Sequence, residues 1–413
     1  MPVSRNDNVW IINHYASTPS TGMGGRSYFM AKGLAESGVD TTLVCANFNH
    51  KLHSPRMIKG AYDVDLSDGF KVARVKVKKY SSSFNKIRIF NWFLFVFRLL
   101  VHYRKFGERP TVVICSSPSL VAFLGAWGVA RLSKAKLIFD VRDIWPLTLR
   151  VLGGYSKRNP LIFLLSKIEH FAYASSDGVM SNLKNFSSYL SEQGFTKKPF
   201  CWVPNSVDFD GLAVKSKLPE EFKGLGAGKF VVGYAGSIGA NDALEYLLDA
   251  AAILRHEAPE IYFVIVGKGQ YLEKFRERID KDGLSNVIFT GPVQKDQVSS
   301  ALALFDVCYL GWLDDDIYRF GVSPNKIPDY FYAAKPVLHS YSGASDPVEL
   351  ASAGITVSAE NAKLIADGIK TLRSMSKVEC EQLGVNGRQF AIDNYEYKAL
   401  SGRLLDYIGG LSA

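Results

Sequence analysis

Glycine-rich turns directly follow apolar runs in both halves of the sequence. Gly24 and Gly25 come after one such run near the N-terminus, and Gly236 with Ser237 follows another in the middle of the chain. Glycine lets the backbone approach a ligand closely, and the N–H groups at the start of a following helix point toward an anion. These turns are therefore candidate sites for a phosphate group or for the charge of a departing leaving group. A purely structural turn is the alternative at each position.

A helix with a positively charged start is predicted around Lys326. Ser323 is a favourable N-cap residue, and Pro324 and Asn325 would then open the helix. A lysine in the first turn opposes the helix dipole unless an anion is bound there, so Lys326 indicates a phosphate-binding site. Asp329 follows one turn later and can accept hydrogen bonds from ribose hydroxyls. The alternative is a capped helix with Asp329 on its solvated face.

Other strand ends carry further candidates for ligand contacts. Gly267 with Lys268 ends one predicted strand, and Val293 follows the next, where backbone groups can bind the edge of a base. In the first half, Arg142 and Asp143 end a strand. Arg142 is a candidate for stabilising leaving-group charge, and Asp143 for positioning or activating an acceptor hydroxyl. A structural ion pair between these two residues is the alternative.

We predict neither a metal site nor a cofactor. The run Asp314–Asp316 has a metal-binding form, but a run of acidic residues is usually a solvated loop. The five cysteines are scattered and the seven histidines lack ligand spacing.

The elements that must position these residues alternate between strands and helices along the whole chain. This alternation is typical of an α/β fold with mostly parallel sheets. The predicted strands are Val9–His14, Thr41–Ala46, Lys71–Val77, Thr111–Ser116, Lys136–Val141, Gly178–Ser181, Phe200–Val203, Phe230–Ala235, Tyr262–Val266, Val287–Thr290, Val307–Leu310, Pro336–His339 and Ile355–Val357.

The apolar periodicity stops at Pro204–Asp208 and then restarts, which predicts two domains. We predict a Rossmann-like domain over residues 1–205, joined by a C-terminal helix at about 392–413, and a second Rossmann-like domain over 206–391. Two such domains would face each other across a cleft. Ligands of open α/β sheets sit at the carboxyl ends of the strands, where the candidate residues lie.

Composition limits the class of protein. With 413 residues, 47% of them apolar, the chain can form substantial cores. The longest apolar run, 92–101, is about half the roughly 20 residues that cross a bilayer. The N-terminal residues lack the pattern of a signal peptide, so we expect a cytoplasmic protein.

The basic residues are concentrated in the first half of the chain. Residues 1–200 hold 28 Lys or Arg and 12 Asp or Glu, which leaves 21 and 28 for the remainder. The segment 86–109 combines basic residues with many aromatic ones. Ordinary core packing and docking on an anionic membrane surface are both open for this segment.

The ordered set of motifs resembles the family 4 retaining glycosyltransferases of the GT-B fold. The resemblance rests on Gly24-Gly25, the segment 203–208, Gly236, the segment 266–269, the segment 289–291, and Asp329 leading into 333–337, and it covers nearly the whole chain. Within that family, residues 139–146 and 323–326 resemble the WbuB-type branch, the N-acetyl-L-fucosamine transferases of bacterial O-antigen synthesis.

The resemblance implies a retaining transfer, without a metal, from a UDP-sugar to a glycan or a polyprenyl-diphosphate-linked acceptor in surface polysaccharide synthesis. The domain over 1–205 would then be the acceptor domain, and the domain over 206–391 the nucleotide-sugar donor domain. The donor would be an N-acetylated amino sugar, and the enzyme would lie at the inner face of the plasma membrane. Asp329 matches the second glutamate of the family's Glu-x7-Glu motif, whereas Gly321 stands in place of the first. The family's histidine in the first domain corresponds to the region of Arg142 and Asp143.

Two other classes of function remain as alternatives. A UDP-sugar 2-epimerase shares the fold but would be expected to carry more acid and base residues at its cleft. A nucleic-acid-binding module would use the basic half, yet no nucleic-acid motif occurs and the aromatic residues cluster in one apolar run. We therefore expect no nucleic-acid partner.

Overall fold

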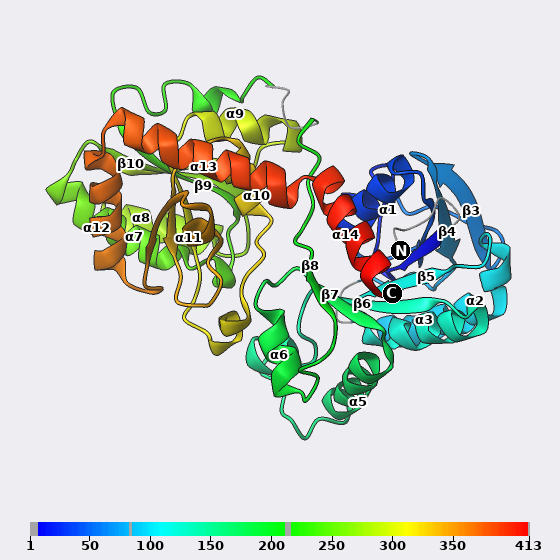
Figure 1. The fold of residues 1–413 in the computed structure, drawn as a ribbon. Coiled ribbons are helices and arrows are strands. Elements are labelled where there is room, and N and C mark those ends of the chain that lie inside the picture. The colour runs from blue at the N-terminus through cyan, green and yellow to red at the C-terminus, as the bar shows by residue number, and fades with distance from the viewer. Residues whose placement is uncertain (1–6, 82–84, 211–215, 412–413) are drawn as a thin grey trace. The chain divides into compact units, whose positions relative to one another are not determined.

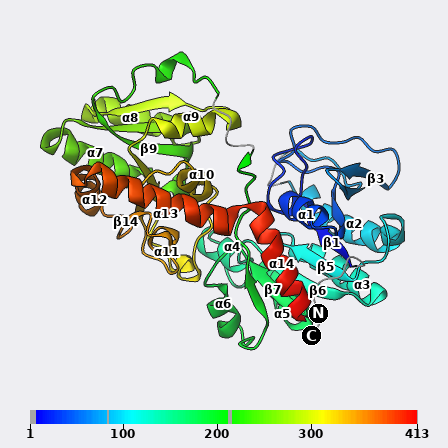
Figure 2. The ribbon, with the colours of Figure 1, turned by 45° about the horizontal axis from the view of Figure 1, so that its top comes forward.

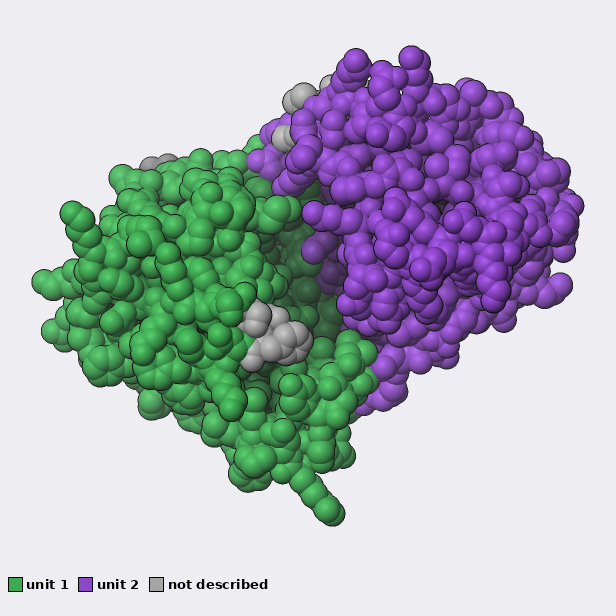
Figure 3. Space-filling view, turned by 180° about the vertical axis from the view of Figure 1, so that it is seen from behind, with its two compact units in different colours: residues 1–207, 397–413 green, residues 208–396 purple. Residues whose placement is uncertain are grey.

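The computed structural model describes residues 7–81, 85–210 and 216–411 (Figure 1). The chain divides into two compact units, which Figure 3 shows in different colours. Unit 1 consists of Met1–Val207 with Tyr397–Ala413, and unit 2 consists of Asp208–Glu396. Each unit has one sheet with its own hydrophobic core, so the two are described separately.

Unit 1 contains an eight-stranded sheet in the order β3-β4-β2-β1-β5-β6-β7-β8. All neighbouring strands are parallel except the pair β3 and β4. The strands are β1 (Asn8–Ile12), β2 (Asp40–Ala46), β3 (Tyr62–Ser67), β4 (Phe70–Val75), β5 (Val112–Ser116), β6 (Lys136–Val141), β7 (Gly178–Ser181) and β8 (Phe200–Trp202). The helices are α1 (Arg26–Glu36), α2 (Ile87–His102), α3 (Leu120–Ser133), α4 (Leu147–Val151), α5 (Pro160–Ser175), α6 (Phe186–Glu192), α14 (Tyr397–Leu411) and the short 3-10 helix η1 (Tyr103–Lys105).

Helices cover both faces of this sheet because the strands are apolar on both faces. The side chains of Val9 and Ile11 on β1 share a buried cluster with residues of α1 and α14. Trp10 faces the other way and stacks against Phe106, just beyond α2 and η1. Fully buried parallel strands are typically such continuous apolar runs. The apolar residues on both faces of β1 thus favour three layers, with the sheet between two layers of helices.

Unit 2 contains a six-stranded parallel sheet in the order β11-β10-β9-β12-β13-β14. Its strands are β9 (Phe230–Ser237), β10 (Ile261–Lys268), β11 (Val287–Gly291), β12 (Val307–Gly311), β13 (Val337–Ser340) and β14 (Gly354–Val357). Its helices are α7 (Leu244–Glu257), α8 (Leu272–Asp282), α9 (Val298–Ala303), α10 (Lys326–Tyr332), α11 (Pro347–Ala351), α12 (Ala362–Ser374) and α13 (Lys377–Tyr395), with 3-10 helices η3 (Glu220–Phe222), η4 (Ala240–Asp242), η5 (Lys295–Gln297) and η6 (Asp316–Phe320).

The α/β fold class and every predicted strand are confirmed, with bounds that shift by a few residues. The strand β3 was not predicted. Its sequence Tyr-Asp-Val-Asp-Leu-Ser is polar at alternate positions, and none of its residues is fully buried. Such an edge strand buries too little apolar surface to give the pattern of a core strand.

Two negative findings apply to the residues that the structure describes. Among them, no helix is both long and apolar enough to cross a bilayer. Across the same ranges, no group of three or more His, Cys, Asp or Glu side chains is arranged to hold a metal ion. In the run Asp314–Asp316, for which we predicted a loop and no metal, Asp315 caps η6 and Asp316 pairs with Arg319.

The C-terminal helix α14 packs against α1 within unit 1 (Figure 2). Gly33 on α1 makes this approach possible, because a Cβ atom there would lie 1.9 Å from Ser401 Oγ on α14. Gly402 also lies on α14, but a Cβ atom there would have no neighbour within 4 Å. The two helical glycines therefore provide a matched pair.

We expect Gly33→Ala to lower the free energy of unfolding by about 1–3 kcal/mol, because the added methyl group forces the two helices apart. Gly402→Ala should raise it by up to about 1 kcal/mol, because alanine is the better helix former at an exposed position. Urea unfolding of the full chain, followed by circular dichroism, measures both changes. Equal effects of the two substitutions would contradict this packing.

Candidate functional site

The predicted donor residues of unit 2 gather at the carboxyl edge of its sheet. In the ladder between β9 and β10, Gly236 lies beside Gly267, and Ser237 lies beside Lys268. The strand order reverses between β9 and β12, so β9 lies at the topological switch point of this sheet. Ligands of open α/β sheets bind outside the strands at such a point.

Glycine is required at two of these positions by close backbone and side-chain approaches. A Cβ atom on Gly267 would lie 1.8 Å from the carbonyl oxygen of Gly236, and Gly267 has a φ of +151°. A Cβ atom on Gly236 would lie 2.0 Å from Lys326 Cε. The glycine at 236 therefore leaves room for the lysine side chain that crosses it.

Lys326 reaches the end of β9 from the start of α10. Its Nζ donates to Asp242 Oδ1 at 2.6 Å and lies 5.0 Å from the centre of the Tyr234 ring. The side chains of Lys326 and Asp242 are 18% and 15% exposed, so the pair is largely shielded from solvent. The lysine charge is thus fixed beside Gly236 and offset by one carboxylate.

Asp242 was not among the predicted site residues. Its carboxylate also accepts from the backbone N–H of Gly239 and from Ser237 Oγ, both at 3.2 Å. These bonds hold the turn between β9 and α7 and leave one oxygen facing Lys326. The spacing of Gly239 and Asp242 is a local turn signal, but the partner in α10 lies 84 residues away in sequence.

The start of α10 differs from the prediction. The predicted cap was Ser323, with Pro324 opening the helix, but α10 begins at Lys326 and Asn325 occupies the cap position without a side-chain cap. The physical reason is Pro328, which has no N–H and can occupy only the first turn of a helix. A start at Pro324 would have placed Pro328 where an intrahelical hydrogen bond is needed.

This correction also changes the electrostatics of the site. The helix α10 has only seven residues, so its dipole is small. The opposing anion expected for a first-turn lysine is supplied by the protein, as Asp242. The charge of Lys326, more than the helix dipole, is what this edge can offer to a phosphate.

Asp329 lies one turn beyond Lys326 and is half-buried. Burial raises the pKa of its carboxyl from 3.8 to about 6, and nearby Lys295 acts in the opposite direction. Within the described ranges the Asp329 carboxylate has no hydrogen-bond partner. A desolvated carboxylate without donors is suited to accept hydrogen bonds from ligand hydroxyls.

The other predicted residues of unit 2 differ in their exposure and backbone conformation. Lys268 is exposed at the end of β10, and Val293 is half-buried just after β11. Gly321 closes η6 with a φ of +94°, a conformation that favours glycine. A glutamate at that position would be strained in this backbone conformation.

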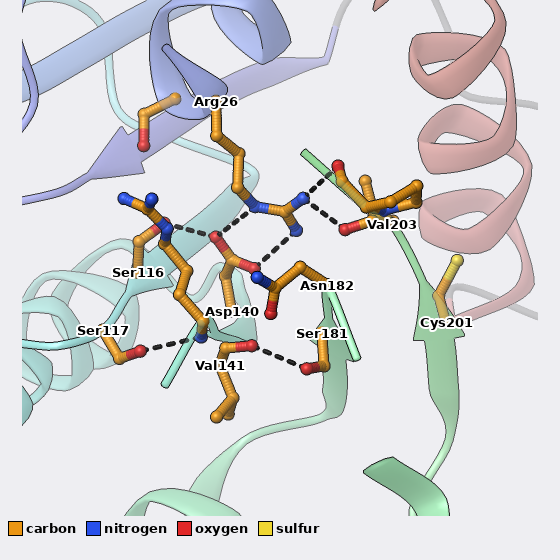
Figure 4. A network of polar contacts seen from close by, with 12 residues as sticks. Arg26, Ser116, Ser117, Asp140, Val141, Ser181, Asn182, Cys201 and Val203 are labelled. Atoms are coloured by element: carbon orange, nitrogen blue, oxygen red, sulfur yellow. Dashed lines mark hydrogen bonds and ion pairs between the residues drawn. The ribbon is translucent and has the colours of Figure 1, made fainter. Parts of the chain in front are cut away.

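A buried ion pair organises the carboxyl edge of the unit 1 sheet (Figure 4). Arg26 Nη2 lies 2.7 Å from Asp140 Oδ1, and the two side chains are 1% and 0% exposed. Ser116 Oγ donates to Asp140 Oδ2 at 2.6 Å, and Arg26 also donates to the carbonyl oxygen of Pro204 at 2.5 Å. Arg26 therefore ties the start of α1 to β6 and to the segment that leads out of unit 1.

Arg142 follows Asp140 and is held at this edge by its backbone. Its N–H donates to Ser117 Oγ at 2.8 Å. Burial and, after it, the charge of Arg26 lower the pKa of Arg142. Its buried Nε has no hydrogen-bond partner in the part of the chain that the structure describes. The Nε–H of this guanidinium can therefore donate a hydrogen bond to an anionic oxygen.

Asp143 is exposed beside Arg142, and its charge acts against the lowering of the Arg142 pKa. Burial lowers the pKa of Lys51, the charges of Arg142 and Arg88 lower it further, and the charge of Asp143 acts in the opposite direction. Lys51 and Arg88 were not predicted site residues, because they come from separate parts of the chain. Gly24 and Gly25 have φ of +68° and +90°, and Gly25 caps α1.

Two family models match the chain. Residues 21–206 match the "Glycosyl transferase 4-like domain", and residues 229–374 match "Glycosyl transferases group 1". The chain carries both domains of a GT-B glycosyltransferase. The first match covers strands β2 to β8 and the polar edge of unit 1 around Arg26 and Arg142. The second covers Gly236, Asp242, Lys326 and Asp329.

Curated relatives support the same superfamily at low identity. The chain is 25% identical over 215 residues to a protein named as a colanic acid biosynthesis glycosyl transferase, WcaI, of Escherichia coli, covering 49% of this chain and 50% of that one. It is 24% identical over 221 residues to a GDP-mannose-dependent alpha-(1-6)-phosphatidylinositol monomannoside mannosyltransferase of Mycolicibacterium smegmatis, covering 50% and 56%. The chain thus aligns with about half the length of these relatives.

Solved structures show the same fold over nearly the whole chain. Sucrose-phosphate synthase from Thermosynechococcus elongatus has a TM-score of 0.74 at 13% identity, covering 98% of this chain and 99% of that one. Anabaena HepE in complex with UDP and glucose has a TM-score of 0.64 at 14% identity, covering 97% and 99%. These likenesses establish the GT-B fold and leave the ligands of this chain to be argued from its own residues.

The raised pKa of Asp329 gives a test that needs no ligand. The folded protein holds this proton more tightly than the unfolded chain, so the free energy of unfolding falls as pH rises from about 4 through about 6. We expect Asp329→Asn to be more stable than the parent above pH 6, by about 1–2 kcal/mol, and equally stable below about pH 4. Urea unfolding over this pH range measures the difference.

Asp280→Asn, at an exposed position on α8, provides the control and should change the free energy of unfolding little at any pH. If Asp329→Asn destabilises the protein at neutral pH, the carboxylate has a stabilising partner, and it is not an acceptor that awaits a ligand.

Proposed function

We propose that the chain is a retaining glycosyltransferase that moves a sugar from a UDP-sugar to a glycan or lipid-linked acceptor in bacterial surface polysaccharide synthesis. The observation that carries this proposal is the position of Lys326, fixed over Gly236 at the switch point of the unit 2 sheet with Asp329 one turn away. A cation and a desolvated carboxylate at this spacing suit a diphosphate and a ribose.

The choice of UDP draws support from structural neighbours. HepE was solved with UDP and glucose, and a trehalose-6-phosphate protein of Escherichia coli with UDP-2-fluoro glucose has a TM-score of 0.71. One curated relative is named as GDP-mannose-dependent, so the base is an open choice that an assay decides. The WbuB-type branch and an N-acetylated amino sugar are the finer form of the proposal.

The chemistry follows from the charges at the two sheet edges. The bond from the anomeric carbon to the β-phosphate oxygen breaks, a bond to the acceptor oxygen forms, and the acceptor proton passes to the departing phosphate. Lys326 stabilises the charge that develops on the diphosphate, and Ser323, Pro324 and Asn325 line its approach. Asp329 binds the ribose hydroxyls, with backbone groups near Gly267, Lys268 and Val293 facing the base.

The polar edge of unit 1 has the complementary role. The unpartnered Nε of Arg142 binds an anionic oxygen, and exposed Asp143 accepts a hydrogen bond from the acceptor hydroxyl. The turn at Gly24 and Gly25 admits a ligand oxygen close to the backbone. No added metal takes part in the proposed mechanism.

Removal of the lysine charge tests the donor site. We expect Lys326→Gln to lower kcat/KM for the nucleotide-sugar by about 100-fold, because one charged donor to the leaving group is lost. Lys335→Gln is the matched control. Lys335 lies before the amino end of β13, and its Nζ donates to the carbonyl oxygen of Ala303. Equal kinetics for the two variants would place the diphosphate elsewhere.

A donor panel tests the reaction itself. Purified full-length chain is incubated with UDP-hexoses, UDP-N-acetylhexosamines and GDP-mannose, with and without a polyprenyl-diphosphate-sugar acceptor, and nucleotide release is measured. We expect acceptor-dependent UDP release and a product with the anomeric configuration of the donor. Release of GDP alone would overturn the base assignment, and an isomerised donor without transfer would show a 2-epimerase.

A further inference from the structure

The helix α2 has large apolar residues on two opposite sides, only one of which is packed. Trp92, Phe95 and Leu99 are buried against the unit 1 core. The opposite stripe, at the spacing of three and four residues that defines one helix face, is exposed: Phe90 49%, Phe93 49%, Phe97 65% and Val101 57%. Core packing, one of the two interpretations open from the sequence, therefore accounts for only half of α2.

The neighbouring helices also carry exposed apolar residues. The helices α2, α3 and α5 follow one another along one side of the unit 1 sheet (Figure 1). Gly125 and Gly128 on α3 allow α2 to pack closely, and Trp127 on α3 contacts Phe171 on α5. The exposed apolar residues beyond α2 include Leu132 on α3, Leu152 after α4, and Phe163 and Leu164 on α5.

The charged residues in this part of unit 1 are mostly basic. Residues 85–175 hold fourteen Lys or Arg and four Asp or Glu, and two of the four acids, Asp140 and Glu169, are buried. Basic residues stand at the ends of the helices: Lys86 before α2, Arg104 and Lys105 after it, Lys134 after α3, and Lys157 and Arg158 before α5. Their long stems can lie along apolar surface while the charged ends reach phosphate groups.

We propose that this face of unit 1, formed by α2, α3, α5 and the basic residues at their ends, docks on an anionic lipid bilayer. The exposed phenylalanines enter the boundary between headgroups and acyl chains, and the lysines and arginines contact anionic headgroups. Among the described residues no helix can span a bilayer, so the contact is peripheral.

A second copy of the chain is a poorer occupant of this surface. A two-fold interface brings the same patch of both copies together, so the basic residues at the ends of α2, α3 and α5 would face the same residues of the second copy. Like charges at such an interface repel, whereas a bilayer containing anionic lipid offers the opposite charge. Membrane docking does not require the donor site to act as proposed above, and its test uses no substrate.

The test is flotation of the full chain with phosphatidylcholine vesicles, with and without phosphatidylglycerol. We expect binding to the vesicles that contain phosphatidylglycerol and loss of binding at high salt. Phe93→Gln with Phe97→Gln should weaken binding at least about tenfold, because the inserted apolar area is removed. Lys157→Glu with Arg158→Glu should weaken it by a similar factor, because two attractive charges near the anionic lipid are replaced by two repulsive ones.

Matched controls lie on unit 2. Val378 and Val385 on α13 are exposed apolar residues, so Val378→Gln with Val385→Gln repeats the chemical change away from the surface. Lys281→Glu with Lys377→Glu does the same for charge. Circular dichroism confirms that each variant folds, as exposed positions predict.

Three results would overturn the proposal. They are equal binding to both kinds of vesicle, equal binding by surface and control variants, or a change from dimer to monomer in the Phe93 and Phe97 variant without a change in vesicle binding. Salt-sensitive retention of the chain on DNA, lost in the lysine and arginine variant while vesicle binding persists, would assign the surface to nucleic acid instead.

Discussion

The ion pair between Lys326 and Asp242 is the interaction on which the donor half of the account depends. It joins α10 to the turn after β9, and it requires glycine at 236, because the lysine stem occupies the space of a side chain there. A largely shielded pair is costly to form, since both charges lose solvent. Its persistence at the switch point of the sheet is the kind of local conflict that functional sites retain. A diphosphate can compete with Asp242 for the same lysine.

Much of the fold could be predicted from sequence, because each core strand is a short apolar run that local pattern identifies. The antiparallel edge strand β3 could not, because its alternate polar residues bury little apolar surface. The residues of the donor edge could also be predicted, because Gly236 and Gly267 mark the ends of predicted strands. The partner of Lys326 could not be predicted, because Asp242 lies 84 residues away in sequence and only the fold brings the two residues together.

A single residue, Pro328, determines where α10 begins and so how strong its dipole can be. Ser323 and Pro324 favour a cap and an opening position, yet Pro328 forces the helix to begin later. The resulting helix is short, so a side-chain charge replaces the dipole as the source of attraction for a phosphate. In unit 1, Arg142 and Asp143 are adjacent in sequence, but only Asp143 is exposed. Backbone bonds to Ser117 and burial beside Arg26 decide their orientation and surroundings.

The most direct measurement is a crystal structure of the chain with UDP bound. We expect a β-phosphate oxygen within about 3 Å of Lys326 Nζ. The ribose hydroxyls should donate to Asp329, and the bond from Lys326 to Asp242 should be broken or shared with the phosphate. A diphosphate bound elsewhere in unit 2, with the Lys326–Asp242 pair at the 2.6 Å seen here, would contradict it.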